Sequence, residues 1–468
     1  MGIRRSWRDA RTGGCGFSTE KGDRSASTGR RRRSTPWCPM AGAICWWELR
    51  MEGCLCCVFD GTWDGSEFGG CMKLTLDFEC AGGKALQPIG ENHWRLETKG
   101  DSFGYNRYFC VRVTSEKGEP PATLRLEVHP DGEIGEKSNF ITHFPCSIWY
   151  DTRNWTRWVP LRHTWEDSVT VLENAVDMRV PIAPGTTMHI ASNPPLRYSD
   201  LLKWLEATQA GHPGRIEVSR IGQSVEGRDI PVVRLRREGK PRFFILAGQH
   251  AGEHSGSWGC EGIVEYLLSS IAEAREMAEA FDWAIVPMLN PDGNVHGWSG
   301  ATAEDAMRAA TGKPPLNPSM DFKGAAQGRE PEYQESRLLW TWLCREFPPD
   351  AMLHFHGYMG WRTNGVAPGD GIYSLADLEK RFPDASRRAA YRAILNRLLF
   401  ETPGHTAHFR TTGGLFEDLI EYQLAEKFGT LGVLYEINVS AGLSEQFQRG
   451  PQVLGAAVRA LMRDVPFT

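Results

Sequence analysis

The sequence has neither an excess of positive charge nor a long apolar run. Its 468 residues include 53 Lys and Arg against 58 Asp and Glu, which gives a formal net charge of -5. Because basic residues do not outnumber acidic ones, the overall charge does not indicate nucleic acid or an anionic membrane as a partner. No uncharged apolar run reaches the roughly 18 residues that a membrane-spanning helix needs, so we expect no membrane span.

Cysteine is scarce over most of the chain. Eight of the twelve cysteines fall within the first eighty residues, and only Cys110, Cys146, Cys260 and Cys344 follow. The first arginines are not followed by a clean apolar stretch, so we expect no secretory signal. In the absence of export we expect free thiols rather than disulfides.

Residues 1–71 are rich in Arg, Gly, Ser, Cys and Trp and show no sustained helical or strand period. Four functional interpretations compete here: a transit peptide, a myristoylated Gly2, a nucleic-acid patch at Arg30–Arg33 and a metal site at Cys54–Cys57. Acidic residues in this segment argue against a transit peptide, and the cysteines lack the paired spacing of a structural zinc site. We expect instead a disordered or non-native extension, with folding beginning near Met72.

From Met72 onward the pattern is typical of β-structure. Alternating apolar and polar residues predict half-buried strands, separated by turn clusters rich in Gly and Pro. These strands are expected at residues 72–80, 108–114, 122–128 and 168–172. Several short strands with regular turns predict a small β-sandwich domain over residues 72–190.

Beyond residue 190 strands alternate with helices. A helix with Ser199 or Asp200 as its N-cap and a second helix over 262–271 are expected. Apolar runs predict strands at 229–235, 242–247 and 283–289. This order predicts an α/β domain over residues 191–468, with a mixed, mostly parallel central sheet flanked by helices. In such sheets ligands bind where the strands end.

One of those strand ends carries metal-type ligands. The strand 243–247 leads into a glycine-rich turn that contains His250 and Glu253. Side chains three residues apart on such a turn can face one point, and catalytic zinc sites use His and Glu ligands with a water. An isolated His-x-x-Glu pattern is weak evidence, but the strand before it and the apolar helix after it strengthen it.

Three motifs together resemble the zinc metallocarboxypeptidases. They are the His-x-x-Glu turn, the Asn-Pro-Asp-Gly segment at 290–293, and residues 221–230, which look like the family's "GxSxEGR" segment. The resemblance covers about residues 190–468, and the β-rich segment before it suggests the cytosolic-carboxypeptidase-like branch. It implies a carboxypeptidase-like fold, one Zn²⁺ ion, peptide or protein C-termini as substrates, and a cytoplasmic location.

The resemblance also implies a third metal ligand, a His at a strand end. Alternation places His354 and His356 on the same face of one predicted strand, so periodicity leaves both open. The family's "HG" pattern selects His356, because Gly357 follows it. His354 is then expected to support the site or to pack beside it.

The remaining site residues follow from the resemblance as well. Glu436, at the end of the apolar strand 432–436, matches the family's catalytic glutamate, and a lone carboxylate is otherwise costly there. Glu417, after a glycine pair, is a candidate pocket residue, and Tyr358 a further candidate for substrate binding. Asn317 would bind the substrate carboxylate if 315–318 is the counterpart of the family's "D-x-N-R" segment.

The arginines depart from the family pattern. Pro318 would stand where the family has the arginine that clamps a C-terminal carboxylate, and proline cannot form that bidentate fork. The arginine that stabilises the oxyanion is expected to be Arg308, with Arg329, Arg362 and Arg410 as other donors. Two further functions therefore stay open: a zinc amidohydrolase that deacylates small N-acyl amino acids, and a non-catalytic binding relic of the fold.

Overall fold

The computed structural model describes eleven segments of the chain. They are residues 72–99, 108–130, 149–151, 155, 157–161, 168–172, 175–358, 369–402, 405–411, 417–439 and 441–464. The expected N-terminal extension, residues 1–71, lies outside them. Within the described segments, no helix has both the length and the apolar character that crossing a bilayer requires.

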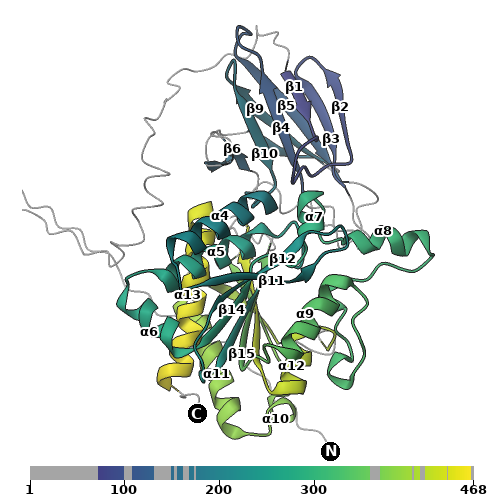
Figure 1. The fold of residues 1–468 in the computed structure, drawn as a ribbon. Helices are drawn as coiled ribbons and strands as arrows, with labels where there is room; N and C mark the ends of the chain where they lie inside the picture. Colours follow the sequence, from purple (N-terminus) through teal and green to yellow (C-terminus); the bar gives the residue numbers. More distant parts are fainter. Residues whose placement is uncertain are drawn as a thin grey trace, which may run out of the picture. The chain divides into compact units, whose positions relative to one another are not determined.

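The first described region is built from ten strands in two five-stranded sheets (Figure 1). One sheet has the order β1-β4-β10-β6-β7, and the other has the order β2-β3-β5-β9-β8. The strands are β1 (Met72–Thr75), β2 (Ala85–Gly90), β3 (His93–Glu97), β4 (Cys110–Ser115), β5 (Ala122–His129), β6 (Trp149–Asp151), β7 (Trp158–Pro160), β8 (Val169–Val171), β9 (Val176–Ile182) and β10 (Thr187–Ala191). Inward side chains of both sheets form one apolar cluster, so the sheets pack as layers.

The second region contains an eight-stranded mixed sheet. Its order is β11-β12-β14-β13-β15-β18-β16-β17. The central strands β14, β13, β15 and β18 pair in parallel, whereas β12 joins β14 and β16 joins β18 in antiparallel. The strands are β11 (Glu217–Gln223), β12 (Asp229–Leu235), β13 (Arg242–Leu246), β14 (Asp282–Val286), β15 (Ala351–Tyr358), β16 (Asp370–Ser374), β17 (His405–Thr411) and β18 (Leu431–Asn438).

Helices cover both faces of this sheet (Figure 1). Alternate residues of β13 separate the two layers: Phe243 and Ile245 join the cluster that includes α5 and α13, while Phe244 and Leu246 join the cluster that includes α9 and α12. The helices are α4 (Tyr198–Gly211), α5 (His254–Leu268), α6 (Ala272–Ala280), α7 (Pro291–Val295), α8 (Ala303–Ala310), α9 (Gln334–Arg345), α10 (Leu378–Arg381), α11 (Ala385–Glu401), α12 (Ile420–Phe428) and α13 (Leu443–Arg459), with short 3-10 turns at Pro318–Met320 and Ala325–Gln327.

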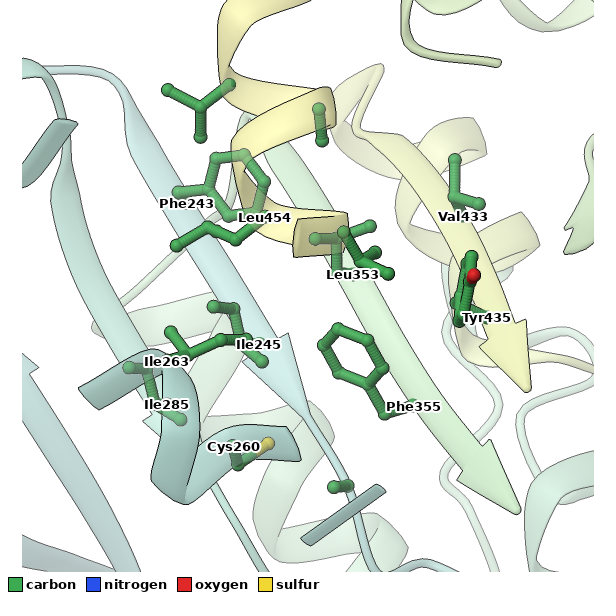
Figure 2. Close-up of a cluster of buried hydrophobic side chains, with 14 of the residues drawn as sticks. Phe243, Ile245, Cys260, Ile263, Ile285, Leu353, Phe355, Val433, Tyr435 and Leu454 are labelled. Carbon is green, nitrogen blue, oxygen red and sulfur yellow. The ribbon is translucent and has the colours of Figure 1, made fainter. Parts of the chain in front are cut away.

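The larger core lies between the sheet and the layer of α5 and α13. Figure 2 shows side chains of β13, β15 and β18, among them Phe355 and Tyr435, beside residues of both helices, such as Ile263 and Leu454. These side chains are almost completely removed from water. Burial on this scale fixes the strand ends, since it holds β13, β15 and β18 rigidly side by side.

Glycines let α5 and α13 approach each other closely. A Cβ atom added to Gly262 would lie 2.0 Å from the carbonyl oxygen of Phe447, and one added to Gly450 would lie 2.0 Å from that of Gly259. Both distances are far below van der Waals contact. Only glycine therefore permits this crossing of the two helices.

The expected α/β architecture is confirmed: a mixed sheet with a parallel centre is flanked by helices and preceded by a β-rich region. The described residues belong to one compact unit, so the boundary expected near residue 190 stays a prediction. The four described cysteines, Cys80, Cys110, Cys260 and Cys344, are free thiols.

Some element boundaries differ from expectation. The predicted N-cap of α4 is wrong: the helix begins at Tyr198 after Arg197, Ser199 Oγ donates to Glu79, and Asp200 pairs with Arg197. α5 begins at His254 rather than near 262. Its first nine residues include three glycines, which lower helix propensity, but packing against α13 compensates for this loss.

Candidate metal centre

The turn after β13 carries His250 and Glu253. Gly248 adopts a φ of +66°, and a Cβ atom there would lie 2.9 Å from the Cα atom of Met288. The turn therefore needs glycine at this position. Glu253 directly precedes the first residue of α5. The turn thus holds both side chains between the end of a buried strand and the start of a buried helix.

Two further strands bring His356 and Glu436 to the same edge of the sheet. β15 pairs in parallel with both β13 and β18, and His356 is the register partner of Glu436. Because carboxyl ends of neighbouring parallel strands meet at one edge, residues from three distant parts of the chain converge there. Glu436 is only partly buried, in contrast to its neighbours Tyr435 and Ile437.

The two histidines converge on the carboxylate of Glu253. Nδ1 of His250 lies 3.0 Å from Oε1, and Nδ1 of His356 lies 2.8 Å from Oε2. The backbone N–H of Gly357 also donates to Oε2, at 3.0 Å. One ligand atom from each of His250, Glu253 and His356 lies within 4.8 Å of the others. In the described part of the chain, no other group of three His, Cys, Asp or Glu residues meets this condition.

This donor set fits a zinc ion. Ligand atoms about 2.1 Å from a tetrahedral zinc lie roughly 3.4 Å apart, which is compatible with the spacing of these donors. Two imidazoles and one carboxylate also match the ligands of catalytic zinc sites, which keep one position open. His250, Glu253 and His356 are thus the residues that would hold the ion.

The three candidate ligands shift one another's pKa values. Burial lowers the pKa of His250, but the charge of Glu253 and its hydrogen bond outweigh burial and raise this pKa to about 9. Burial raises the pKa of Glu253, yet the charges of both histidines hold it well below the ordinary carboxyl value. Burial, together with the charge of His354, lowers the pKa of His356 to about 4. At pH 7 and without a metal, Glu253 is therefore ionised, His356 is neutral and His250 is protonated, so a bound metal ion would have to displace one proton from His250.

His354 belongs to a separate buried pair. Its Nδ1 lies 2.5 Å from Oε1 of Glu421 on α12, and both side chains are almost fully buried. The rings of His354 and His356 lie 4.3 Å apart, centroid to centroid. Of the two histidines that the sequence left open, His356 has the donor atom in the cluster, and His354 packs beside it.

A buried carboxylate joins two of the sequence motifs. Asp292, on α7, is fully buried and accepts hydrogen bonds from Ser224 Oγ at 2.6 Å, from the backbone of Glu226 at 2.9 Å and from Arg228 at 2.7 Å. Arg228 thereby neutralises the buried charge. The sequence analysis did not predict this network, although it singled out both motifs, residues 221–230 with Ser224 and Arg228 and residues 290–293 with Asp292.

The Asn-Pro-Asp-Gly segment is a helix start rather than a plain turn. The side chain of Asn290 accepts from the backbone of Gly293 at 2.8 Å, and Pro291 occupies the first helical position. The backbone N–H of Asn290 donates to the carbonyl of Gly248 at 2.9 Å. The segment therefore supports the turn that carries His250.

Asn317 lies beside the cluster. Its Oδ1 is 3.0 Å from Nε2 of His250, although 67 residues separate the two in sequence. The side chain of Gln249 donates to the carbonyl of the next residue, Pro318, at 3.0 Å. The expected role of Asn317 in binding a substrate carboxylate stays a prediction.

Among the described residues, the contacts do not link the other expected site residues to the cluster of His250, Glu253 and His356. Arg308 donates to Glu332 at 2.7 Å and to the carbonyl of Pro314 at 2.9 Å. Glu417 is exposed and accepts from Tyr422 at 3.2 Å. Tyr358 ends β15, but its side chain lies outside the described residues. The roles of all three stay predictions.

Comparison with known proteins matches residues 201–361 to the family model described as zinc carboxypeptidase. The chain contains a zinc carboxypeptidase domain. The matched segment includes His250, Glu253 and His356, whereas Glu436 lies beyond it.

Curated relatives resemble parts of this domain. Cytosolic carboxypeptidase 2 of Danio rerio is 32% identical over 124 residues, which cover 24% of this chain and 17% of the relative. Inactive metallocarboxypeptidase ecm14 of Talaromyces stipitatus is 29% identical over 132 residues, which cover 25% of this chain and 22% of the relative. The chain thus spans about a fifth of the length of these curated relatives.

A solved structure shares the fold. The metallo-carboxypeptidase from Burkholderia cenocepacia aligns with a TM-score of 0.67 at 17% identity, over 84% of this chain and 99% of its own. At this low identity the likeness concerns the fold alone. Its coverage is too large for the α/β region by itself, so it includes the β-rich region.

Proposed function

We propose that this chain is a zinc-dependent hydrolase that removes C-terminal amino acids from peptides or proteins. The observation that carries the proposal is the convergence of His250, Glu253 and His356, whose ligand atoms lie within 4.8 Å of one another, beside Glu436. We further propose that the site takes one zinc ion and that the protein acts in the cytoplasm, as the names of the cytosolic relatives suggest.

A zinc ion held there would acidify a water molecule and polarise the scissile carbonyl group. Glu436 accepts the proton of the attacking water and then passes it to the nitrogen of the leaving amine. Its position at a strand end, partly open to solvent, suits a group that must exchange protons. Glu253, His250 and His356 keep their donor atoms fixed, because backbone and carboxylate contacts hold them.

The substitution Glu436→Gln tests this role. It keeps the shape of the side chain but removes the carboxylate that accepts the proton. We expect hydrolysis of a peptide substrate to fall by about 10²- to 10⁴-fold, while elemental analysis finds the zinc content unchanged. Full activity in the variant would contradict the mechanism.

A matched control is Glu379→Gln, which makes the same chemical change in an exposed residue of α10. It should retain both zinc and activity. Loss of zinc from the Glu436 variant would instead indicate that Glu436 serves as a ligand.

A second candidate is a deacylase that acts on small N-acyl amino acids. It is favoured by the pairing of the candidate arginines: Arg308 binds Glu332, and Arg329 lies within ion-pair distance of Asp321. Both guanidinium groups thus already have an acidic partner in the protein. The third candidate, a binding relic, draws support from the relatives that are named inactive.

A substrate panel distinguishes these functions. Peptides with a free C-terminus, the same peptides with an amidated C-terminus, and N-acyl amino acids are incubated with the zinc-loaded protein. A carboxypeptidase is expected to cleave only the free termini. Equal cleavage of free and amidated peptides would refute the exopeptidase proposal, exclusive cleavage of N-acyl amino acids would indicate a deacylase, and no turnover would indicate a relic.

A further inference from the structure

The amide group of Asn317 has one determined orientation. Its Oδ1 atom lies 2.9 Å from the backbone nitrogen of Ser319 and 3.0 Å from Nε2 of His250. A backbone N–H can only donate a hydrogen bond. The atom of Asn317 that faces Ser319 must therefore be the oxygen and not the amide nitrogen, and the usual ambiguity of an asparagine amide does not arise here.

This orientation requires a proton on Nε2 of His250. An amide oxygen only accepts, so the Nε2 atom that approaches it must be the N–H donor. Without a metal, Nδ1 also donates, to the carboxylate oxygen of Glu253 at 3.0 Å. Because Nε2 keeps its proton for Asn317, Nδ1 is the nitrogen that would lose its proton and bind the ion. The hydroxyl of Ser319, 2.6 Å from the same oxygen, adds no constraint, because a hydroxyl can rotate.

Two adjacent contacts hold this arrangement in place. Gln249, almost fully buried, donates to the carbonyl of Pro318 at 3.0 Å, and its neighbour His250 donates to Asn317. Two consecutive residues of the metal-ligand turn thus bind two consecutive residues of the 317–318 segment. The two contacts therefore tie the position of this segment to the ring of His250.

We propose that Asn317 is a positioning residue that sets the tautomer of His250 and thereby raises zinc affinity; this inference rests on the proposed zinc site. Groups that accept from the second nitrogen of a ligating histidine typically change metal affinity by about 10- to 100-fold. Asn317 supplies this acceptor as a neutral amide. A carboxylate in its place would accept the same proton and would make the imidazole more basic.

The test compares the zinc dissociation constants of four forms of the full chain, measured by competition with a chromogenic chelator. Asn317→Ala should bind zinc about 10- to 100-fold more weakly than the unchanged protein. Asn317→Asp should bind at least as tightly as the unchanged protein. Ser319→Ala, which keeps the backbone N–H that orients the amide, is the matched control and should bind with nearly unchanged affinity.

The outcomes test the role of Asn317 separately from the existence of the zinc site. If Asn317→Asp binds as weakly as Asn317→Ala, or if Asn317→Ala binds normally, the inference is wrong although the zinc site stands. If the unchanged protein binds no zinc, the proposed function fails, and this inference with it.

A second measurement uses the unchanged protein and so remains decisive if a variant fails to fold. Nitrogen-15 spectra of the histidine rings in the zinc-loaded, unchanged protein should show a proton on Nε2 of His250 and none on Nδ1. A proton on Nδ1 would refute the proposed tautomer. Thermal unfolding of the metal-free variants shows separately whether they fold.

Discussion

At the scale of single residues, Glu335 is a carboxyl group removed from water. It lies in the first turn of α9 with only 3% of its surface exposed. Its Oε1 atom accepts a long hydrogen bond of 3.4 Å from the backbone of Val225, and its Oε2 atom has no partner among the described residues. Burial, with the nearby charges of Asp292 and Glu304, raises the pKa of Glu335 to about 7.

This raised pKa predicts a loss of stability with increasing pH. Below the ordinary glutamate value, near 4.5, the group is protonated in both the folded and the unfolded chain. Between pH 4.5 and about 7 the unfolded chain releases this proton while the folded chain retains it, so stability falls as the pH rises and the loss is complete above pH 7. Glu335→Gln should therefore unfold with a free energy up to about 3 kcal/mol higher than the unchanged protein at pH 8.5, and nearly equal to it at pH 4.5.

Urea unfolding of both proteins at the two pH values checks this expectation. Glu332→Gln serves as the control of opposite sign, because the hydrogen bond from Arg308 lowers the pKa of Glu332. That substitution should cost a little stability at high pH rather than add to it. A Glu335→Gln gain that is the same at both pH values would show that its ionisation is not the cause.

Individual ligands could be foreseen from the sequence, but their neighbours could not. His250 and Glu253 stand out because they are three residues apart on a turn between a strand and a helix. The contact of Asn317 with His250 spans 67 residues, and that of Glu421 with His354 also spans 67. No local pattern encodes such contacts, since they depend on how the strands pair.

At the scale of elements, the glycines between α5 and α13 define a crossing that tolerates no side chain. Gly450→Ala would place a Cβ atom 2.0 Å from the carbonyl oxygen of Gly259, a backbone atom that cannot rotate away. The helices would have to separate, which should lower the free energy of unfolding by about 3 kcal/mol or more. Urea unfolding followed by circular dichroism measures the loss.

Gly211→Ala is the control for this substitution. Gly211 also lies in a helix, α4, but a Cβ atom there would meet nothing within 4 Å. Because alanine favours helices, this variant should be as stable as the unchanged protein or more stable, by up to about 1 kcal/mol. Equal losses in both variants would mean that the helix crossing is not responsible.

Elements were more predictable than their ends. The strands β5, β12 and β13 lie within one residue of the expected ranges, because their alternating or continuous apolar residues are clear signals. β14 ends at Val286, before Pro287, although the apolar run continues to residue 289. Proline cannot donate to the ladder, whereas a hydrophobicity pattern counts it only as a neutral residue.

At the scale of the whole molecule, the alternation of strands and helices predicted the α/β class, and the fold bears this out. The strand order β14-β13-β15-β18 could not be predicted from the sequence, because it depends on pairing between segments that lie far apart in the chain. Nor could the packing of the two β-rich sheets, which share one apolar cluster. Composition and periodicity specify the layers, while tertiary contacts specify their order.

The convergence of three strands on one edge also has a consequence for the order of synthesis. His250 and Glu253 are synthesised first. His356 follows 103 residues after Glu253, and Glu436 on β18 follows later still. A nascent chain that ends before β15 would lack the third proposed ligand, and one that ends before β18 would lack the proposed base. A chain of this kind would therefore lack the proposed activity while it is still on the ribosome, so the arrangement of the strands delays the proposed hydrolysis until β18 has been synthesised.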